Sequence, residues 1–497
     1  MSPYFMGIDA GTTIIKTVLF NIDGTKIAES SRENKITLLR NGGAEIDLDE
    51  YWKGVAECIQ EITAMPHIHK HNITSLAVAA NGVTFMPVDK AGKSLRKAFS
   101  YLDTRGTEEA DELLGYFGQH LFFVNTGQPR LQPFHVIVKT LWMKHHEPEI
   151  FDDMDKLVMV HAYLSYKLTG ELRATYSLAA TTGFLKLIDG STWDDALNTL
   201  GISVHSLCDI NNAGERIGTV LPEVAEYLGL LSDTTVICGS LDQAAGCIGS
   251  GNIFTGNITE STGTVLAINA TVDKPVLDVN NPIPCFAHAV RDKYIMLPWY
   301  PFGGSVLKWF RDEFLQSTEY GTFVEYEQAI AGVVSVPIGC EGLILLPQFP
   351  GENSSENNEY ATGAFFNVGF HHTRSHFIRA ILESTGFLIR KNMEMLQSLN
   401  VACETLCSIG GGARSSIWNQ IKADILQMPI RTCEIEEAGA LGACILAAVG
   451  CGEFTSIGEC CTHFVRFNKT YEPDRKNAQQ YQECYEKYIE LDGQMKK

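Results

Sequence analysis

The sequence predicts an α/β protein that folds as two domains. Its 497 residues exceed the size at which one hydrophobic core usually divides. Strand-like and helical runs alternate through the first half, as they do in α/β folds. Each half also opens in the same way, with a strand, a turn of small residues and a second strand. A glycine-rich joint at 251–256 sets the expected boundary, with one domain at 1–250 and the other at 251–497.

The elements of the first half follow from local patterns. MGIDAGTTIIKTVLFNIDG supplies two β-branched runs around Gly11-Thr12-Thr13, which predicts a strand hairpin at about 4–9 and 14–20. DLDEYWKGVAECIQEIT begins with acidic residues and repeats apolar residues along one face, which predicts a helix. The remaining elements expected are strands on both sides of Asn81-Gly82, helices at 135–148 and 158–168, and a strand that leads into a helix at Gln243.

The second half repeats the opening and then becomes mainly helical. ITESTGTVLAINAT reads as strand, Thr-Gly-Thr turn and strand. Helical spacing of apolar residues follows in SHFIRAILESTGFLIRKNMEML, SSIWNQIKADIL and GALGACILAAV. The polar, turn-rich stretch at 351–363 predicts an exposed loop.

Composition excludes several classes of partner. With 59 acidic against 39 basic residues, the formal net charge is −20, which argues against nucleic acid and anionic membranes as partners. The N-terminus lacks the pattern of a signal peptide, and the uncharged stretch at 438–452 is shorter than the ~18 apolar residues of a membrane span. The fourteen cysteines include no C-x-x-C pair, so we expect reduced, mostly buried thiols rather than zinc ligands. A cytosolic protein is expected.

The opening hairpin carries residues suited to a phosphate. A tight turn of small residues leaves backbone N–H groups free to bind an anion. Thr12 and Thr13 add hydroxyl donors, Lys16 adds a positive charge, and Asp9 is placed to hold a magnesium ion. A purely structural turn is the alternative. A second such turn, Thr262-Gly263-Thr264, would hold the same phosphate chain from the other half.

Two further positions complete the candidate site. Asp242 ends an apolar strand at a corner of small residues, where a carboxylate can accept the proton of an attacking hydroxyl; a helix N-cap is the alternative. The run Gly410-Gly411-Gly412-Ala413 leads into a helix at Ser415–Ser416, which suits an adenine or ribose, although a plain glycine loop competes with this interpretation. The Walker motif is absent, because AGKS at 91–94 lacks the required preceding glycine. The Rossmann motif is also absent, because no G-x-G-x-x-G follows a strand and opens a helix.

Eight segments taken together resemble the FGGY carbohydrate kinases, of the superfamily that includes actin and the heat-shock ATPases. The segments, in the family's order, are GIDAGTT…K, YLDTRG, GSLDQAAGCIGSG, STGT, GGSVLKWFRDEF, HHTRSHFIRAILES, IGGGARSSIWNQIKADIL and EEAGALGACILAAVG. The resemblance implies two ribonuclease-H-like (actin-like ATPase) domains with the active site in the cleft between them. It also implies ATP and Mg²⁺ as cofactors.

The resemblance implies a role for each matching residue. Asp242 matches the general base, which accepts a proton while a primary hydroxyl of the sugar attacks the γ-phosphate in line. Asp9 and Asp242 match the residues near the magnesium. The ATP-binding residues expected are Gly11, Thr12, Thr13, Lys16, Gly263, Thr264, Gly411, Gly412, Ala413 and Asn419.

Substrate choice is expected to depend on the segments around ANGVTF and YLDTRG. D-xylulose kinases usually have Met-His-Gly where this chain has Gly82, Val83 and Thr84, and the Arg-Glu pair of glycerol kinases is absent. ANG and KHHEPEIFDDMDKLVMVHAYLSYKLTG look closer to the L-xylulose kinase branch. The expected substrate contacts are Asn81, Gly82, Asp103 and Asp242, with Arg105 either supporting Asp103 or forming a structural salt bridge.

The resemblance favours an ATP-dependent kinase of a ketopentose, with no nucleic-acid or membrane partner and a homodimer as the default assembly. Kinases of D-xylulose, glycerol, gluconate or erythritol would share every catalytic residue. From another class, an actin-like or chaperone-like ATP-driven binding protein would keep both phosphate turns but would need no base at Asp242.

Overall fold

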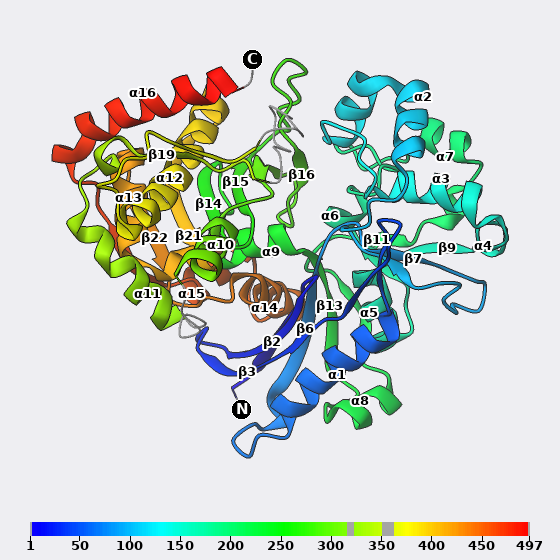
Figure 1. Ribbon diagram of the computed structural model, residues 1–497. Coiled ribbons are helices and arrows are strands. Elements are labelled where there is room, and N and C mark those ends of the chain that lie inside the picture. The colour runs from blue at the N-terminus through cyan, green and yellow to red at the C-terminus, as the bar shows by residue number, and fades with distance from the viewer. Residues whose placement is uncertain (1, 316–322, 350–361, 496–497) are drawn as a thin grey trace. The chain divides into compact units, whose positions relative to one another are not determined.

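A computed structural model describes residues 2–315, 323–349 and 362–495, and it divides into two compact units (Figure 1). Unit 1 comprises Met1–Ile253, Asp273–Ile295 and Glu437–Arg466, and unit 2 comprises Phe254–Val272, Met296–Glu436 and Phe467–Lys497. Segments from the second half of the sequence therefore complete unit 1. The boundary at 250/251 stays a prediction, and the loop expected at 351–363 lies, except for its last two residues, outside the described residues.

The central sheet of unit 1 has six strands in the order β12-β13-β6-β1-β2-β3. Their bounds are β1 Tyr4–Ala10, β2 Ile14–Asn21, β3 Lys26–Glu33, β6 Ile73–Ala80, β12 Arg216–Thr219 and β13 Thr235–Leu241. The predicted hairpin is confirmed, because β1 and β2 pair antiparallel. The strands β1, β6 and β13 are mutually parallel neighbours, so their carboxyl ends meet at one edge of the sheet.

Helices cover both faces of this sheet. Figure 1 shows α14 (Ala438–Gly450) on one side of the strands, and α1 (Leu48–Thr63) and α5 (Val160–Thr169) on the other. The helix α14 packs against β1 and against α9 (Asp242–Gly249) at very short range, since a Cβ on Gly7 would come within 1.9 Å of the Ala440 carbonyl oxygen. This close packing explains why α14 is built from small residues.

A second sheet in unit 1 has the order β4-β5-β8-β7-β9. Its bounds are β4 Ile36–Leu38, β5 Ala44–Ile46, β7 Phe85–Val88, β8 Ala98–Phe99 and β9 Lys156–Met159. The helix predicted at 158–168 therefore begins two residues late, because its first two apolar residues belong to β9 and pair with β7.

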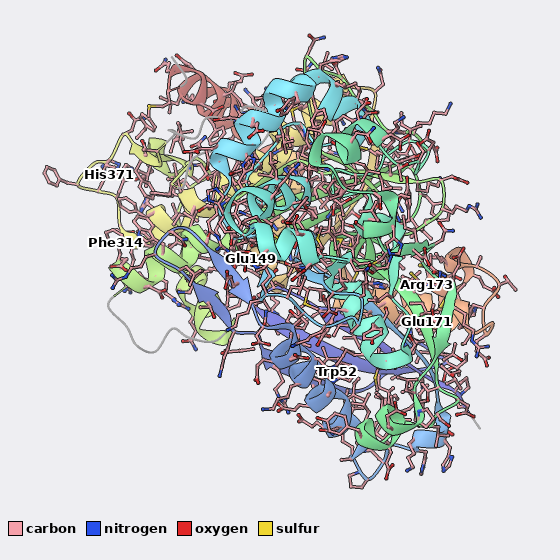
Figure 2. The ribbon with its side chains drawn as sticks, turned by 90° about the vertical axis from the view of Figure 1, so that its right-hand side faces the viewer. Trp52, Glu149, Glu171, Arg173, Phe314 and His371 are labelled. Carbon is pink, nitrogen blue, oxygen red and sulfur yellow. The ribbon has the colours of Figure 1, made fainter. Side chains whose placement is uncertain are left out.

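Unit 1 also contains the helices α2 Thr107–Thr126, α3 Val136–His146, α4 Pro148–Asp153, α6 Tyr176–Ala179, α7 Asp194–Leu200, α8 Pro222–Leu228 and α15 Ile457–Phe464. A small parallel pair joins β10 (Arg173–Thr175) to β11 (Asp209–Asn211). Figure 2 shows Arg173 beside Glu171 at the start of this pair, where their side chains form an exposed 3.6 Å ion pair.

Unit 2 repeats the strand pattern of unit 1. Five strands of an eight-stranded sheet run in the order β15-β14-β21-β22-β23, with bounds β14 Gly256–Thr262, β15 Leu266–Val272, β21 Cys403–Ile409, β22 Ile430–Cys433 and β23 Phe467–Tyr471. The other three are β16 Cys285–Ala287, β17 Tyr294–Met296 and β18 Trp299–Tyr300. An antiparallel hairpin is followed by two parallel neighbours and an antiparallel edge strand, as in unit 1. Its helices are α10 Gly304–Phe314, α11 Phe323–Ala331, α12 Arg374–Ser398, α13 Ser416–Leu426 and α16 Ala478–Met495. The repeated hairpin seen in the sequence is thus a repeat of topology.

The structure contains fourteen free cysteines, and most of them are buried, as predicted; their reduced state stays a prediction. Within the described ranges, no helix combines the length and apolar character needed to cross a membrane.

Candidate functional site

Three parallel strands of unit 1 deliver the predicted residues to one place. In the sheet register, Ala10 of β1 and Leu241 of β13 both pair with Ala80 of β6. The residues that follow these strands, Gly11, Asn81 and Asp242, therefore emerge side by side. Carboxyl ends of parallel strands are where α/β sheets bind ligands.

The opening hairpin places two charged side chains next to each other. Asp9 and Lys16 are direct partners across β1 and β2, so their side chains leave the same face of the sheet. The Lys16 ammonium lies 3.4 Å from Glu437, which precedes α14 and also pairs with Lys26 at 3.2 Å. Lys16 keeps about a third of its side chain exposed, so it remains accessible to a phosphate group.

Two carboxyl groups in this region have raised pKa values. Burial raises the pKa of Asp242 from 3.8 to about 7, with a further contribution from the charge of Asp9. Burial also raises the pKa of Asp9 to about 6, against the opposing effect of Lys16. Two such carboxyl groups close together repel each other once both are ionised.

The donor set fits a magnesium ion. Mg²⁺ takes oxygen ligands and is commonly held by one or two carboxylates together with substrate phosphates. Asp9 and Asp242 would supply the carboxylates, and the cation would relieve their repulsion. Among the described residues no group of three or more His, Cys, Asp or Glu side chains is arranged to hold a metal.

Asp242 is held at the first turn of α9 by the backbone. Leu241 occupies the N-cap position, and the Asp242 carboxylate accepts the N–H of Gln243 at 2.7 Å. The strand β13 bulges just before it, where a Cβ on Gly239 would come within 1.9 Å of the Val78 carbonyl oxygen. The Ser177 hydroxyl accepts the N–H of Leu241 at 2.9 Å. The bulge and this hydrogen bond fix the direction in which the Asp242 side chain leaves the sheet.

We expect Asp242→Asn to gain stability over wild type as the pH rises. The folded protein binds the Asp242 proton more tightly than the unfolded chain, so this stabilisation is complete below about pH 4 and is lost as the pH rises to about 7. The free energy of unfolding of the variant minus that of wild type should therefore be about 2 kcal/mol larger at pH 8 than at pH 5. Urea unfolding at both pH values measures the difference. An equal offset between Asp242→Asn and wild type at the two pH values would contradict a raised pKa of Asp242.

The turn after β6 contains unsatisfied polar atoms. Asn81 is buried and donates its side-chain N–H to the Ala10 carbonyl at 3.0 Å, whereas its Oδ1 has no hydrogen-bond partner. The buried Thr84 hydroxyl also lacks a partner. Between them, Val83 has a φ of 53°, which is strained for a β-branched residue. Unpaired polar atoms and backbone strain are typical of ligand sites, in keeping with the predicted substrate contacts at Asn81 and Gly82.

Asp103 lies in a saturated ion-pair network. Its carboxylate is fully buried and accepts the Ala44 N–H at 2.9 Å, the Lys139 ammonium at 2.7 Å, and both the backbone N–H and guanidinium of Arg105. Arg105 also contacts Glu45 at 3.0 Å, so the structural salt bridge considered for it is present. The contact of Asp103 with sugar hydroxyls stays a prediction; in this structure the carboxylate fixes the loop that follows β8.

The same loop carries a residue that the sequence reasoning missed. Tyr101 is 41% exposed, and partial burial together with the negative charge of Asp242 raises its pKa. The only sequence signal for Tyr101 is an aromatic residue two positions before Asp103. Lys139, which holds Asp103 from α3, was also missed, because only the fold brings it there.

In unit 2, the second turn and the glycine run meet at adjacent strand ends. Ser261 of β14 pairs with Ile409 of β21, so Thr262-Gly263-Thr264 and Gly410 follow neighbouring parallel strands. The Gly263 carbonyl accepts the N–H of Gly304 at 2.7 Å, which joins the turn to the start of α10. The second turn and the glycine run therefore lie next to each other within this unit.

A cavity of about 340 Å³ opens between these pieces. It is lined by predicted residues (Gly263, Thr264, Gly411, Gly412) and by residues that the sequence reasoning did not select, among them Ser305, Lys308, Tyr326, Ile330 and Trp418. The other two predicted residues, Ala413 and Asn419, contact each other: the buried Asn419 side chain donates to the Ala413 carbonyl at 2.7 Å. An apolar wall with a flat glycine floor suits a nucleobase and ribose.

Comparisons with known proteins agree with this geometry. Residues 4–249 match the N-terminal domain, and residues 258–451 the C-terminal domain, of the FGGY family of carbohydrate kinases. A xylulose kinase of Bacillus subtilis (strain 168) is 30% identical over 485 residues, covering 98% of this chain and 96% of that protein. Two solved structures from Lactobacillus acidophilus each superpose with a TM-score of 0.91. They are a gluconate kinase (25% identical; 100% and 99% of the two chains) and a ligand-bound xylulose kinase (26%; 99% and 98%).

Proposed function

Because the chain belongs to the FGGY family of carbohydrate kinases, we propose that it transfers the γ-phosphate of ATP to a primary hydroxyl of a ketopentose of the xylulose type. Family membership makes it a sugar kinase with ATP as phosphoryl donor, and it decides against the actin-like or chaperone-like alternative. The observation that carries the proposal is the alignment of the phosphate turn, Asn81 and Asp242 at the ends of three parallel strands.

In this mechanism each unit contributes part of the chemistry. The cavity of unit 2 would bind adenosine, and the turn of each unit, Gly11–Thr13 and Gly263–Thr264, would bind phosphate. Asp9 and Asp242 would hold Mg²⁺, which when bound would neutralise charge on the phosphates. Asp242 accepts the proton of the sugar hydroxyl as it attacks, a role helped by its position beside the phosphate turn. Positioning and charge neutralisation supply most of the rate enhancement.

The substrate class is inferred from the site and the relatives together. Asn81 Oδ1 and the Thr84 hydroxyl are buried polar atoms without a protein partner beside the end of β6, and Tyr101 lies near enough to Asp242 to be affected by its charge. Xylulose is named for the relative at 30% identity, whereas one structural neighbour is a gluconate kinase, so a sugar acid or another polyol is the alternative. The two cations around Asp103, Arg105 and Lys139, are already paired with Glu45 and Asp103, so this network offers no free cation for a sugar acid. This favours a neutral ketose.

Release of ADP from MgATP in the presence of a panel of sugars tests the proposal. The panel contains D- and L-xylulose, D-ribulose, glycerol, erythritol and gluconate, each with a no-sugar control. We expect one ketopentose to raise turnover by more than about 100-fold over the no-sugar rate, since water is a poor substitute for a positioned hydroxyl. Preference for gluconate or a polyol would overturn the ketopentose assignment while leaving the kinase class intact.

We further propose that the protein works in the cytosol as a homodimer. Fourteen free thiols suit a reducing compartment, and two-fold symmetric pairs are the commonest assemblies. Sedimentation velocity with and without MgATP measures the assembly state, and a monomer at micromolar concentration would contradict it.

A further inference from the structure

All three carbonyl groups of the first phosphate turn are held by side chains or backbone from outside the hairpin. The Tyr51 hydroxyl donates to the Gly11 carbonyl at 2.7 Å. The Asn34 side-chain N–H donates to the Thr12 carbonyl at 2.6 Å, and its backbone N–H donates to the Thr13 carbonyl at 2.8 Å. Nothing in the turn's own sequence requires these partners, which come from α1 and from the end of β3.

The direction of a carbonyl fixes the direction of the next N–H. A trans peptide is planar, so its C=O and N–H point in opposite directions. Holding the Gly11 carbonyl therefore directs the Thr12 N–H away from Tyr51, and holding the Thr12 carbonyl directs the Thr13 N–H away from Asn34. Within the described part of the chain, neither of these two N–H groups has a protein acceptor. These two N–H groups are therefore oriented donors that can bind an anion.

Tyr51 is well suited to act as a permanent donor. It lies in the first turn of α1, next to Trp52, which Figure 2 labels, and it is 1% exposed. Burial and the charges of Asp9 and Asp242 raise its pKa well above the ordinary value, so the phenol keeps its proton at neutral pH. The helix that carries it is itself fixed, since Asp47 caps α1 by accepting the N–H groups of Asp49 and Glu50.

We propose that Tyr51 and Asn34 are positioning residues that pre-orient the turn for the phosphate groups of ATP. Tyr51 sets the Thr12 N–H and Asn34 sets the Thr13 N–H. Neither side chain touches the phosphate. The inference rests on the proposed function in one respect, that the turn at 11–13 binds phosphates. Without these anchors the peptide planes can rotate, and part of the binding free energy is spent on restoring the oriented conformation.

The test compares Tyr51→Phe with Tyr163→Phe. Tyr163 is a matched control, because it is also buried and its hydroxyl donates to a single partner, Asp49, at 2.6 Å, away from the turn. The loss of one neutral hydrogen bond should weaken binding of a non-hydrolysable ATP analogue by about three- to ten-fold in Tyr51→Phe. Adenosine, which has no phosphate, should bind equally well to both variants and to wild type. Asn34→Ala should reproduce the selective loss.

Steady-state kinetics and thermal unfolding complete the test. In Tyr51→Phe the KM for MgATP should rise while the KM for sugar stays within about twofold of wild type, and the melting temperature should match that of Tyr163→Phe. Equal weakening of adenosine and the ATP analogue would show a merely structural role and would overturn the proposal. A rise in the KM for sugar alone would also overturn the proposal, because it would indicate that the Tyr51 hydroxyl positions Asn81 rather than the phosphate turn. If wild type binds ATP but phosphorylates no sugar, the proposed function fails, while the ligand titrations still decide the role of Tyr51.

Discussion

Asp242→Asn should abolish sugar-dependent turnover while leaving nucleotide binding intact. The amide keeps the size of the side chain and its hydrogen bond to the Gln243 N–H, but it cannot accept the proton of the attacking hydroxyl. Loss of a general base commonly costs about 10²- to 10⁴-fold, and we expect the upper end because Asp242 also belongs to the proposed magnesium site. Measurement of kcat with the preferred sugar, at saturating MgATP, gives the size of the loss.

Two controls separate the chemistry from the fold. Asp209→Asn removes an exposed carboxylate of the same unit and should keep wild-type turnover. The ATP analogue should bind Asp242→Asn within a few-fold of wild type, because the turns and the cavity of unit 2 are unchanged. Sugar-dependent turnover within tenfold of wild type would remove Asp242 from the role of base. A variant that binds neither nucleotide nor sugar would indicate a damaged fold rather than lost chemistry.

The parts of the site predicted from sequence are those that short segments encode. Asp9, the small turn and Lys16 lie within eight residues of each other, and the glycine run directly precedes its helix. Strand ends and helix starts have local signals, such as apolar runs that stop at glycine or a capping serine. The eight matching segments then predict roles that no single pattern could, and the family comparison confirms the family, while the roles of the individual residues stay predictions.

The parts that escaped prediction depend on contacts between distant residues. Tyr51 and the Gly11 carbonyl are 40 positions apart, and Tyr51 was read only as one member of a helix. Lys139 meets Asp103 across 36 positions, so the motif around Asp103 looked like a free sugar ligand when its oxygens are occupied by protein donors. The helix at 438–450 was predicted, but its packing against β1 depends on close approach at Gly7, which one sequence does not show.

Lys422→Met should destabilise unit 2 severely. Lys422 on α13 is fully buried, and its ammonium donates to Glu260 at 2.9 Å, to Thr262 at 3.2 Å and to Ser408 at 3.3 Å. Methionine fills similar space but leaves the Glu260 carboxylate buried without its counter-charge, which typically costs about 3–5 kcal/mol. Thermal unfolding should show a fall of about 10 °C for a unit of this size. The exposed control Lys469→Met should move the midpoint by less than about 2 °C.

The position of this ion pair links stability to nucleotide binding. Glu260 lies on β14 two residues before the phosphate turn begins, Ser408 lies on β21 just before the glycine run, and Lys422 lies on the helix that follows that run. The Ser408 hydroxyl also donates to Glu260 at 2.6 Å, and the Thr262 hydroxyl donates to the same carboxylate. One buried charge pair therefore fastens the three elements that shape the cavity.

The double variant Glu260→Gln/Lys422→Met distinguishes the charge from the hydrogen bonds. Removing both charges eliminates the uncompensated carboxylate, so stability should recover by at least about 2 kcal/mol relative to Lys422→Met alone. The affinity for the ATP analogue should recover less. The hydroxyls of Thr262 and Ser408 both donate to the Glu260 carboxylate, and the substitution removes this shared acceptor, which aligns the two loops. Full recovery of both properties would mean that the network only neutralises charge. No recovery of stability would mean that the shape of the lysine side chain, rather than its charge, supports α13.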